Sequence, residues 1–236
     1  FGHNLSQHPA VQKADILHLH WINQGFLSLK NIQQLSQLGK PIVWTLHDMW
    51  AFTGGCHYTG ACKQFLTECK HCPYLRRPGP NDLSHRVWKR KQVQFPSEIH
   101  FVTCSEWLAR TAAQSGLLKN YPIQSIPNTI DIQVFKPQSA KDRTAYRNKH
   151  GIKKEAFLLL FVAMKVQEER KGFRHLQAAL EIVKEQNPDR PIELMVLGRS
   201  SPEELKALPY PSHLLGLLHE PELLAHAYGS ADAFVI

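Results

Sequence analysis

The feature that most constrains the fold is a repeated alternation of short apolar runs with amphipathic stretches. The apolar runs are rich in β-branched and aromatic residues and do not alternate cleanly, which favours strands buried on both faces of a parallel sheet. The stretches between them place apolar residues at helical spacing. This order predicts right-handed crossovers and a doubly wound α/β fold. The expected strands span 15–21, 41–47, 99–105, 157–163, 192–198 and 233–236, and the expected helices span 26–38, 106–115, 173–185 and 220–228.

The 236 residues are long enough for two modest domains. Residues 123–142 contain three turn signals and no long apolar run, so we expect a domain over 1–125, a crossover over 126–142 and a second domain over 143–236. No apolar run approaches the roughly 18–20 residues that a membrane-spanning helix needs. The chain has no initiator methionine and ends in an apolar run, and we interpret it as an internal fragment.

Positive charge is concentrated in one part of the chain. The net charge is +8, and residues 63–91 alone hold eight Lys and Arg against two Asp and Glu. Such a segment favours phosphate-bearing partners, namely nucleic acid, anionic lipid headgroups or a lipid diphosphate. Trp88 among these cations favours contact with an anionic membrane. The alternative is an ordinary solvated face.

Histidines stand at the ends of the first two expected strands. In open α/β sheets ligands bind beyond the carboxyl ends of the strands. His18 and His20 alternate with leucines, so both should point to one face. His47 and Asp48 end the second strand, and a histidine there is suited to donate a hydrogen bond to an anion or a sugar hydroxyl. We therefore expect His47 to contact a ligand, with His18, His20 and Asp48 beside it in the cleft.

A basic run follows the fourth expected strand. Lys165, Arg170 and Lys171 lie before the next helix, whose amino terminus also favours anions. Neither GxxxxGK[ST] nor GxGxxG is present, so the run predicts a pyrophosphate clamp without a Walker loop. A solvated basic turn is the alternative. The fifth strand ends in Gly198 and Arg199, which we place on the nucleotide side.

Four of the five cysteines lie in the loop 54–73, at Cys56, Cys62, Cys69 and Cys72. The last two have the spacing of a metal knuckle, whereas the first two are spaced more loosely. A structural zinc site would hold together a loop with little core of its own. Two disulfides, which need an oxidising compartment, and a cluster of reduced thiols remain open.

The sequence resembles family 4 glycosyltransferases, the group 1 glycosyl transferases, and within them a bacterial branch that builds exopolysaccharide and O-antigen-type glycans. The motifs that carry the resemblance are TLHDMWAFTGGCHYTGAC with its CKHCP tail, VTCSEWLAR, SIPNTIDIQVFKP, LLLFVAMKVQEERKGFRHLQAAL and LLGLLHEPELLAHAYGSADAFVI. The family has the GT-B fold, so the resemblance implies two Rossmann-like domains with parallel sheets that face each other across a cleft.

The resemblance implies retaining transfer of a sugar from a nucleotide-sugar to a saccharide or lipid-linked saccharide, with no metal or other cofactor for catalysis. By resemblance, His47 is catalytic and approaches the donor sugar, and His18, His20 and Asp48 lie on the acceptor side of the cleft. Lys171 binds the donor phosphate, and Lys165 replaces an upstream arginine. The last motif, with His219, lies beside the nucleotide. A cytoplasmic enzyme, peripheral on the inner face of the plasma membrane through segment 63–91, is the expected setting.

The sequence departs from the family in places. Thr129 stands where the family has glycine after Pro-Asn, and the paired-glutamate motif that grips the donor would begin after Ile236. We therefore expect the chain as given to be inactive alone. Two alternatives remain: a basic zinc-knuckle module that binds nucleic acid, and a non-catalytic glycosyltransferase homologue. Aromatic residues lie mostly in strands, so no nucleic-acid partner is expected.

Overall fold

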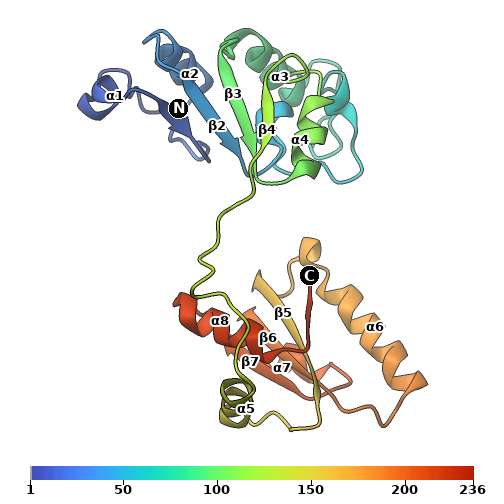
Figure 1. Cartoon of the computed structure of the whole chain (residues 1–236). Helices are drawn as coiled ribbons and strands as arrows, with labels where there is room; N and C mark the ends of the chain where they lie inside the picture. The colour runs from blue at the N-terminus through green and yellow to red at the C-terminus, as the bar shows by residue number, and fades with distance from the viewer. Residues whose placement is uncertain (1) are drawn as a thin grey trace. The chain divides into compact units, whose positions relative to one another are not determined.

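The computed structural model describes residues 2–236. The chain divides into two compact units, with the boundary between residues 129 and 130. Each unit is built on a four-stranded parallel sheet (Figure 1). The boundary between the units falls inside the segment 126–142 that the turn signals mark as a crossover. Within the described residues, no helix has the length and apolar character to cross a membrane.

The sheet of unit 1 keeps the order of the sequence, β1-β2-β3-β4. Three helices of at least two turns follow its first three strands, and a short helix α1 precedes the sheet. Two 3₁₀ turns, η1 and η2, lie in the long connection between β2 and α3. The elements are α1 Pro9–Lys13, β1 Leu17–Leu19, α2 Leu29–Ser36, β2 Ile42–Leu46, η1 Trp50–Phe52, η2 Gln64–Leu66, α3 Leu83–Gln94, β3 Ile99–Thr103, α4 Glu106–Ala113 and β4 Ile123–Ser125.

The core of unit 1 forms on one face of its sheet. Trp44 of β2 and Phe101 of β3 are buried and their rings lie 5.7 Å apart. Alternate positions are more exposed: His18 separates two buried leucines of β1, and His100 is exposed in β3. The expectation of burial on both faces is therefore wrong for β1 and β3.

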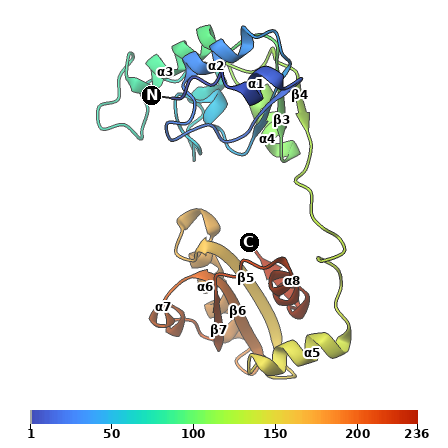
Figure 2. The same ribbon diagram turned by 90° about the vertical axis from the view of Figure 1, so that its left-hand side faces the viewer.

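Unit 2 has the strand order β7-β6-β5-β8. Residues of α6 and α7 share one hydrophobic cluster with the sheet, and residues of α5 and α8 share another, so helices cover both faces (Figure 2). The first seven residues of β6 are all buried, which confirms two-sided burial for that strand. The elements are α5 Ala140–Lys149, β5 Phe157–Lys165, η3 Glu169–Lys171, α6 Phe173–Gln186, β6 Ile192–Arg199, α7 Pro202–Lys206, β7 Ser212–Gly216, α8 Pro221–Ser230 and β8 Ala233–Val235.

The expected strands and helices are present, with shifted ends. Ser105 caps α4 by accepting a hydrogen bond from the Leu108 N–H, as its position predicts. The helix expected from residue 26 instead begins at Leu29, because Ser28 forms a capping box with Asn31. Sequence reasoning missed β4, β7 and α5, which carry too few buried residues to stand out as apolar runs.

Candidate functional site

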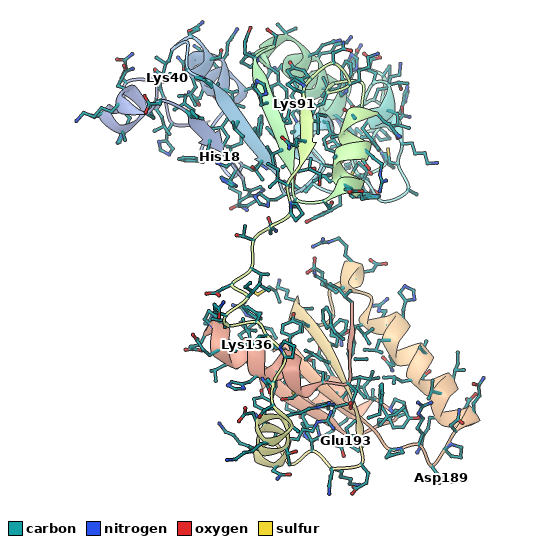
Figure 3. All side chains as sticks on the ribbon, in the orientation of Figure 1. His18, Lys40, Lys91, Lys136, Asp189 and Glu193 are labelled. Atoms are coloured by element: carbon teal, nitrogen blue, oxygen red, sulfur yellow. The ribbon has the colours of Figure 1, made fainter. Side chains whose placement is uncertain are left out.

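Three histidines gather where β1 and β2 end, on the face of the sheet where His18 is exposed. Figure 3 labels His18. The ring centroids of His18 and His20 are 4.2 Å apart, and those of His20 and His47 are 5.4 Å apart. His20 Nδ1 and His47 Nε2 share a hydrogen bond of 3.1 Å, and His18 Nε2 contacts Thr45 Oγ1 at 2.8 Å. Burial and the neighbouring His20 lower the pKa of His18. One of the two facing nitrogens, His20 Nδ1 or His47 Nε2, donates this hydrogen bond and the other accepts it, so the tautomers of the two rings are coupled.

Asp48 and His57 form a second polar pair beside this cluster. His57 Nδ1 lies 2.7 Å from Asp48 Oδ2, and Asp48 Oδ1 accepts a hydrogen bond from the Trp50 N–H. The His57 side chain remains 39% exposed, whereas Asp48 is only 13% exposed. The carboxylate therefore fixes the orientation of the imidazole and leaves Nε2 for a ligand. His57 is not among the site residues predicted from the sequence, in which it stands next to Cys56 in the cysteine-containing loop.

A buried lysine holds the turn that follows His47 and Asp48. Lys91 of α3 is fully buried (Figure 3). Its Nζ donates hydrogen bonds to the carbonyl oxygens of Trp50 and Thr53, the second at 3.0 Å, and lies 3.6 Å from the centroid of the Trp50 ring. Burial lowers the pKa of Lys91 to about 7, while Cys69, Asp48 and Cys56 act in the opposite direction. Lys91 thus connects α3 to the end of β2.

The basic segment 63–91 is less basic on its surface than the sequence predicts. Lys91 and Trp88, three residues apart on α3, both face the core, and Trp88 is only 4% exposed. Trp88 is therefore not available as a membrane anchor, which corrects that expectation. Glu68 pairs with Lys70 at 3.3 Å and with Lys89 at 3.0 Å. The exposed cations for which the structure records no ion pair are Lys63, Arg76, Arg77, Arg86 and Arg90.

The four cysteines of the loop 54–73 lie near one another. Cys56 and Cys72 are hydrogen-bonding neighbours, and burial together with the other thiols raises the pKa of Cys56 to about 11. Burial likewise raises the pKa of Cys69 to about 11. Every cysteine in the described part of the chain is a free thiol. Within it, no group of three or more His, Cys, Asp or Glu side chains is arranged to hold a metal ion.

Unit 2 places two lysines and a helix amino terminus, a combination suited to an anion, at the carboxyl end of β5. The strand ends at exposed Lys165, and Lys171 belongs to the 3₁₀ turn before α6. Gly172, with φ of 74°, takes the N-cap position and offers no side-chain acceptor to the first N–H groups of this fourteen-residue helix. Uncapped N–H groups and the helix dipole favour a negative charge there. Arg170 of the same turn forms an ion pair with Glu168, so a phosphate would have to compete for it.

An apolar cavity of about 500 Å³ opens beside this arrangement. It lies at the carboxyl ends of β5 and β6 and beyond β7, and Met164, next to Lys165, is part of its wall. His219, expected on the nucleotide side, also lines it. Sequence reasoning did not foresee the cavity, because its walls come from five separate segments. The other lining residues are Ile130, Phe135, Val162, Ala163, Leu197, Leu217, Leu218, Leu224 and Tyr228.

Gly198 and Arg199 end β6 at this edge. The Arg199 carbonyl accepts a hydrogen bond from the Val166 N–H at 3.1 Å, and the Arg199 side chain is exposed. Gly198 has φ of 144°, and a Cβ atom there would lie 1.8 Å from the Ala163 carbonyl oxygen. Close packing of β6 on β5 therefore requires glycine at this position.

Replacing Gly198 by alanine should destabilise unit 2 by more than about 1 kcal/mol, because the new methyl group must displace β5 and the backbone disfavours a side chain. Gly216→Ala is the matched control, since Gly216 also has a positive φ of 69° but no atom within 4 Å of its Cβ position. Urea unfolding of both variants measures the difference. Equal losses for the two variants would contradict the clash with Ala163.

Solved glycosyltransferases share this fold. A glycosyltransferase from Rickettsia africae matches with a TM-score of 0.60 at 12% identity, over 94% of this chain and 51% of that chain. A UDP-forming α,α-trehalose-phosphate synthase from Burkholderia xenovorans matches with a TM-score of 0.54 at 12% identity, over 94% of this chain and 52% of that one. The two Rossmann-like units therefore have the α/β fold of a glycosyltransferase of the GT-B type.

The family is shown by sequence. The family model of Glycosyltransferase Family 4 matches residues 3–134, which is more than half of the chain, and the chain belongs to that family. A putative colanic acid biosynthesis glycosyl transferase of Escherichia coli K12, WcaC, is 33% identical over 88 residues. That match spans 34% of this chain and 22% of the relative, and this chain covers about half the length of the two solved structures.

Proposed function

We propose that this chain forms part of a retaining glycosyltransferase that moves a sugar from a nucleotide-sugar to a saccharide or lipid-linked saccharide in the synthesis of a bacterial surface polysaccharide. Membership of glycosyltransferase family 4 supports the reaction class. The similarity to a protein described as a putative colanic acid biosynthesis glycosyl transferase supports the polysaccharide setting.

The observation that carries the proposal is the pairing in unit 2 of an apolar cavity with an anion-binding arrangement. A nucleotide combines a flat base with a charged diphosphate. The cavity of about 500 Å³ suits the base, and its neighbours Lys165, Lys171 and the uncapped amino terminus of α6 suit the phosphates. We assign Gly198, Arg199 and His219 to the nucleotide side of this site.

The leaving group of the proposed transfer is a nucleoside diphosphate, which gains negative charge as the bond to the sugar breaks. Fixed cations and helix N–H groups stabilise such charge in the transition state. In the proposed mechanism Lys171 and the amino terminus of α6 do this, without a catalytic metal or cofactor. Arg170 joins them by exchanging Glu168 for a phosphate oxygen.

In unit 1, we propose that His47 donates a hydrogen bond to the donor sugar, and that His18, His20 and Asp48 contribute to the acceptor side. The hydrogen bond between His20 and His47 supports this, because it orients the His47 ring at the end of β2. The exposed arginines of segment 63–91 support a peripheral contact with an anionic membrane or a lipid diphosphate, on the cytoplasmic face of the plasma membrane.

A panel of nucleotide-sugars tests the proposed function. The full-length protein is titrated with UDP-, GDP- and dTDP-linked sugars and with the free nucleotides, and unfolding temperature and calorimetry report binding. We expect one nucleotide family to bind and to raise the unfolding temperature of the protein. No binding across the panel, with affinity instead for nucleic acid that falls steeply with salt, would favour the nucleic-acid module.

His47→Ala separates an enzyme from a non-catalytic homologue. We expect kcat in the full-length protein to fall about 10²-fold, because the donor sugar loses an orienting hydrogen bond. His100→Ala is the matched control, since His100 is an exposed histidine near the amino end of β3, away from the carboxyl ends of the strands. The transfer rate with the donor found in the panel measures the effect. A rate that does not change with His47→Ala would remove this residue from the mechanism.

A further inference from the structure

We propose that Trp21 and His57 bind one pyranose ring of the acceptor saccharide, with the ring lying on the Trp21 indole and one hydroxyl group bonded to His57 Nε2. The inference rests on the proposed function, because it names the part of the acceptor that unit 1 would hold. Trp21 follows the carboxyl end of β1, and His57 lies beside it in the loop after β2. Neither residue is among the site residues predicted from the sequence.

Trp21 is exposed although the chain on both sides of it is held in place. It follows β1 by two residues, and it is 50% exposed. On one side, the His20 carbonyl accepts a hydrogen bond from the Trp44 Nε1–H at 2.9 Å. On the other side, Ile22 is buried, and its carbonyl accepts a hydrogen bond from the Leu27 N–H at 3.0 Å. A fixed backbone therefore presents the indole to solvent at the edge of the sheet where ligands bind in open α/β folds.

His57 stands beside Trp21 in a fixed orientation. The two ring centroids lie 6.1 Å apart, with 54° between the ring planes. His57 Nδ1 lies 2.7 Å from Asp48 Oδ2, and the His57 carbonyl accepts a hydrogen bond from the Met49 N–H at 3.0 Å. These two contacts close the loop of residues 49–57 onto the end of β2. The tautomer that donates from Nδ1 to the carboxylate leaves Nε2 as an acceptor, so Asp48 is the positioning residue of the pair.

The indole also borders the histidine cluster at the strand ends. Trp21, His47 and Asp48 line one small depression in the surface. Its volume is about 10 Å³, which is enough for about one water molecule and too little for a sugar ring. The ring would therefore lie across the mouth of the depression, against the exposed indole, without entering it.

A pyranose ring fits the chemistry of these two side chains. One face of a common hexose carries several C–H groups, which are slightly positive and pack on the negative face of an indole. The hydroxyl groups on its rim both donate and accept hydrogen bonds, so one of them can donate to His57 Nε2. An oriented imidazole has no role beside lipid acyl chains. The pair therefore favours a saccharide over a membrane surface.

Binding of simple glycosides to the full-length protein tests the site. The probes are the methyl pyranosides of glucose, galactose, mannose and fucose, titrated without nucleotide and followed by saturation-transfer NMR and by the indole N–H signal of Trp21. We expect at least one glycoside to bind in the millimolar range and to shift this signal, because one ring contact buries little area. Trp21→Ala should lower the affinity about tenfold or more, whereas Trp21→Phe, which keeps an aromatic face, should retain most of it.

Two matched controls separate this site from a general effect of exposed rings. Trp107→Ala removes another exposed indole, on α4, and should leave the affinity for the glycoside unchanged. His57→Phe keeps an aromatic ring but removes Nε2, and should weaken binding as Trp21→Ala does. His100→Phe, near the amino end of β3, should not. If His57→Phe does not fold, the Trp21 signal of the native protein still decides whether the sugar binds at this site.

Three results would overturn the proposal: no binding of any glycoside, binding that leaves the Trp21 signal unmoved, and equal losses in Trp21→Ala and Trp107→Ala. The nucleotide-sugar panel fails or succeeds separately. A protein that binds a nucleotide but no glycoside at Trp21 would lose this inference and keep the proposed function. A protein that binds a glycoside at Trp21 but no nucleotide would keep the saccharide site and lose the proposed transfer.

Discussion

Replacing Lys171 by alanine is expected to lower kcat of the full-length protein by about 10²–10³-fold, which is the usual cost of removing one group that stabilises transition-state charge. Lys171 lies in the 3₁₀ turn immediately before the uncapped amino terminus of α6. The helix N–H groups remain in the variant, so binding of the ground-state donor should weaken less than kcat falls. A loss mainly in kcat is the sign of an interaction made in the transition state.

Steady-state kinetics against the donor identified in the nucleotide-sugar panel measure this effect. Lys154→Ala serves as the control, because Lys154 is exposed before the amino end of β5, at the opposite edge of the sheet from Lys171. Lys171→Arg should recover part of the rate, since it restores a cation. An unchanged kcat in Lys171→Ala would show that the phosphate binds elsewhere. Binding of free nucleotides to the cavity of unit 2 would then be measured as a separate test.

The two-unit α/β architecture could be predicted because its signals are local. Apolar runs such as those of β5 and β6 read as buried strands whatever surrounds them. Ser105 marks the start of α4 through its own side chain, which caps the first turn of the helix. The sequence also placed His18, His20 and His47 at neighbouring strand ends, because parallel strands bring their carboxyl ends to one edge. What these residues do remains a prediction.

Other parts of the candidate site could not be predicted, because they depend on contacts between distant segments. Lys91 appears in sequence as one cation in a basic run, and only packing of α3 turns it inward onto Trp50 and Thr53. His57 becomes notable only through its contact with Asp48. The cavity of unit 2 has walls from β5, β6, α8, the segment after β7 and the segment 130–135. Periodicity reports which face of an element is buried but not which partner covers it.

The polar connection between α5 and β8 gives the largest expected effect on stability. Arg147 of α5 is nearly buried and donates hydrogen bonds to Ser230 O, Ala156 O and Asp232 Oδ2, the last at 2.7 Å. Asp232 Oδ2 also accepts a hydrogen bond from the Leu158 N–H of β5. One guanidinium group therefore satisfies groups from α8, from the start of β5 and from the residue before β8. None of these contacts of Arg147 was predicted from the sequence.

Arg147→Met should destabilise unit 2 by about 3–5 kcal/mol, because it removes the buried ion-pair partner of Asp232 together with the hydrogen bonds that the guanidinium group donates to Ser230 O and Ala156 O. Arg143→Met is the matched control: Arg143 also pairs with Asp232, but its side chain is 36% exposed against 10% for Arg147. An exposed pair of this kind contributes about 0–1 kcal/mol. Urea unfolding, followed through hydrogen exchange of the β5 amides, measures both variants.

The same network predicts how stability depends on pH. Burial alone would raise the pKa of Asp232, but the Leu158 N–H and the two arginines outweigh burial and hold the pKa below its ordinary value. A carboxyl group with a lowered pKa stabilises the folded state above the pKa of the unfolded chain, and this stability is lost as the pH falls through the folded value. Acid should therefore destabilise the native protein more than it destabilises Arg147→Met, in which the arginine that favours the carboxylate is gone. Parallel pH dependence in the two proteins would show that Asp232 is not held by Arg147, whatever the loss at neutral pH.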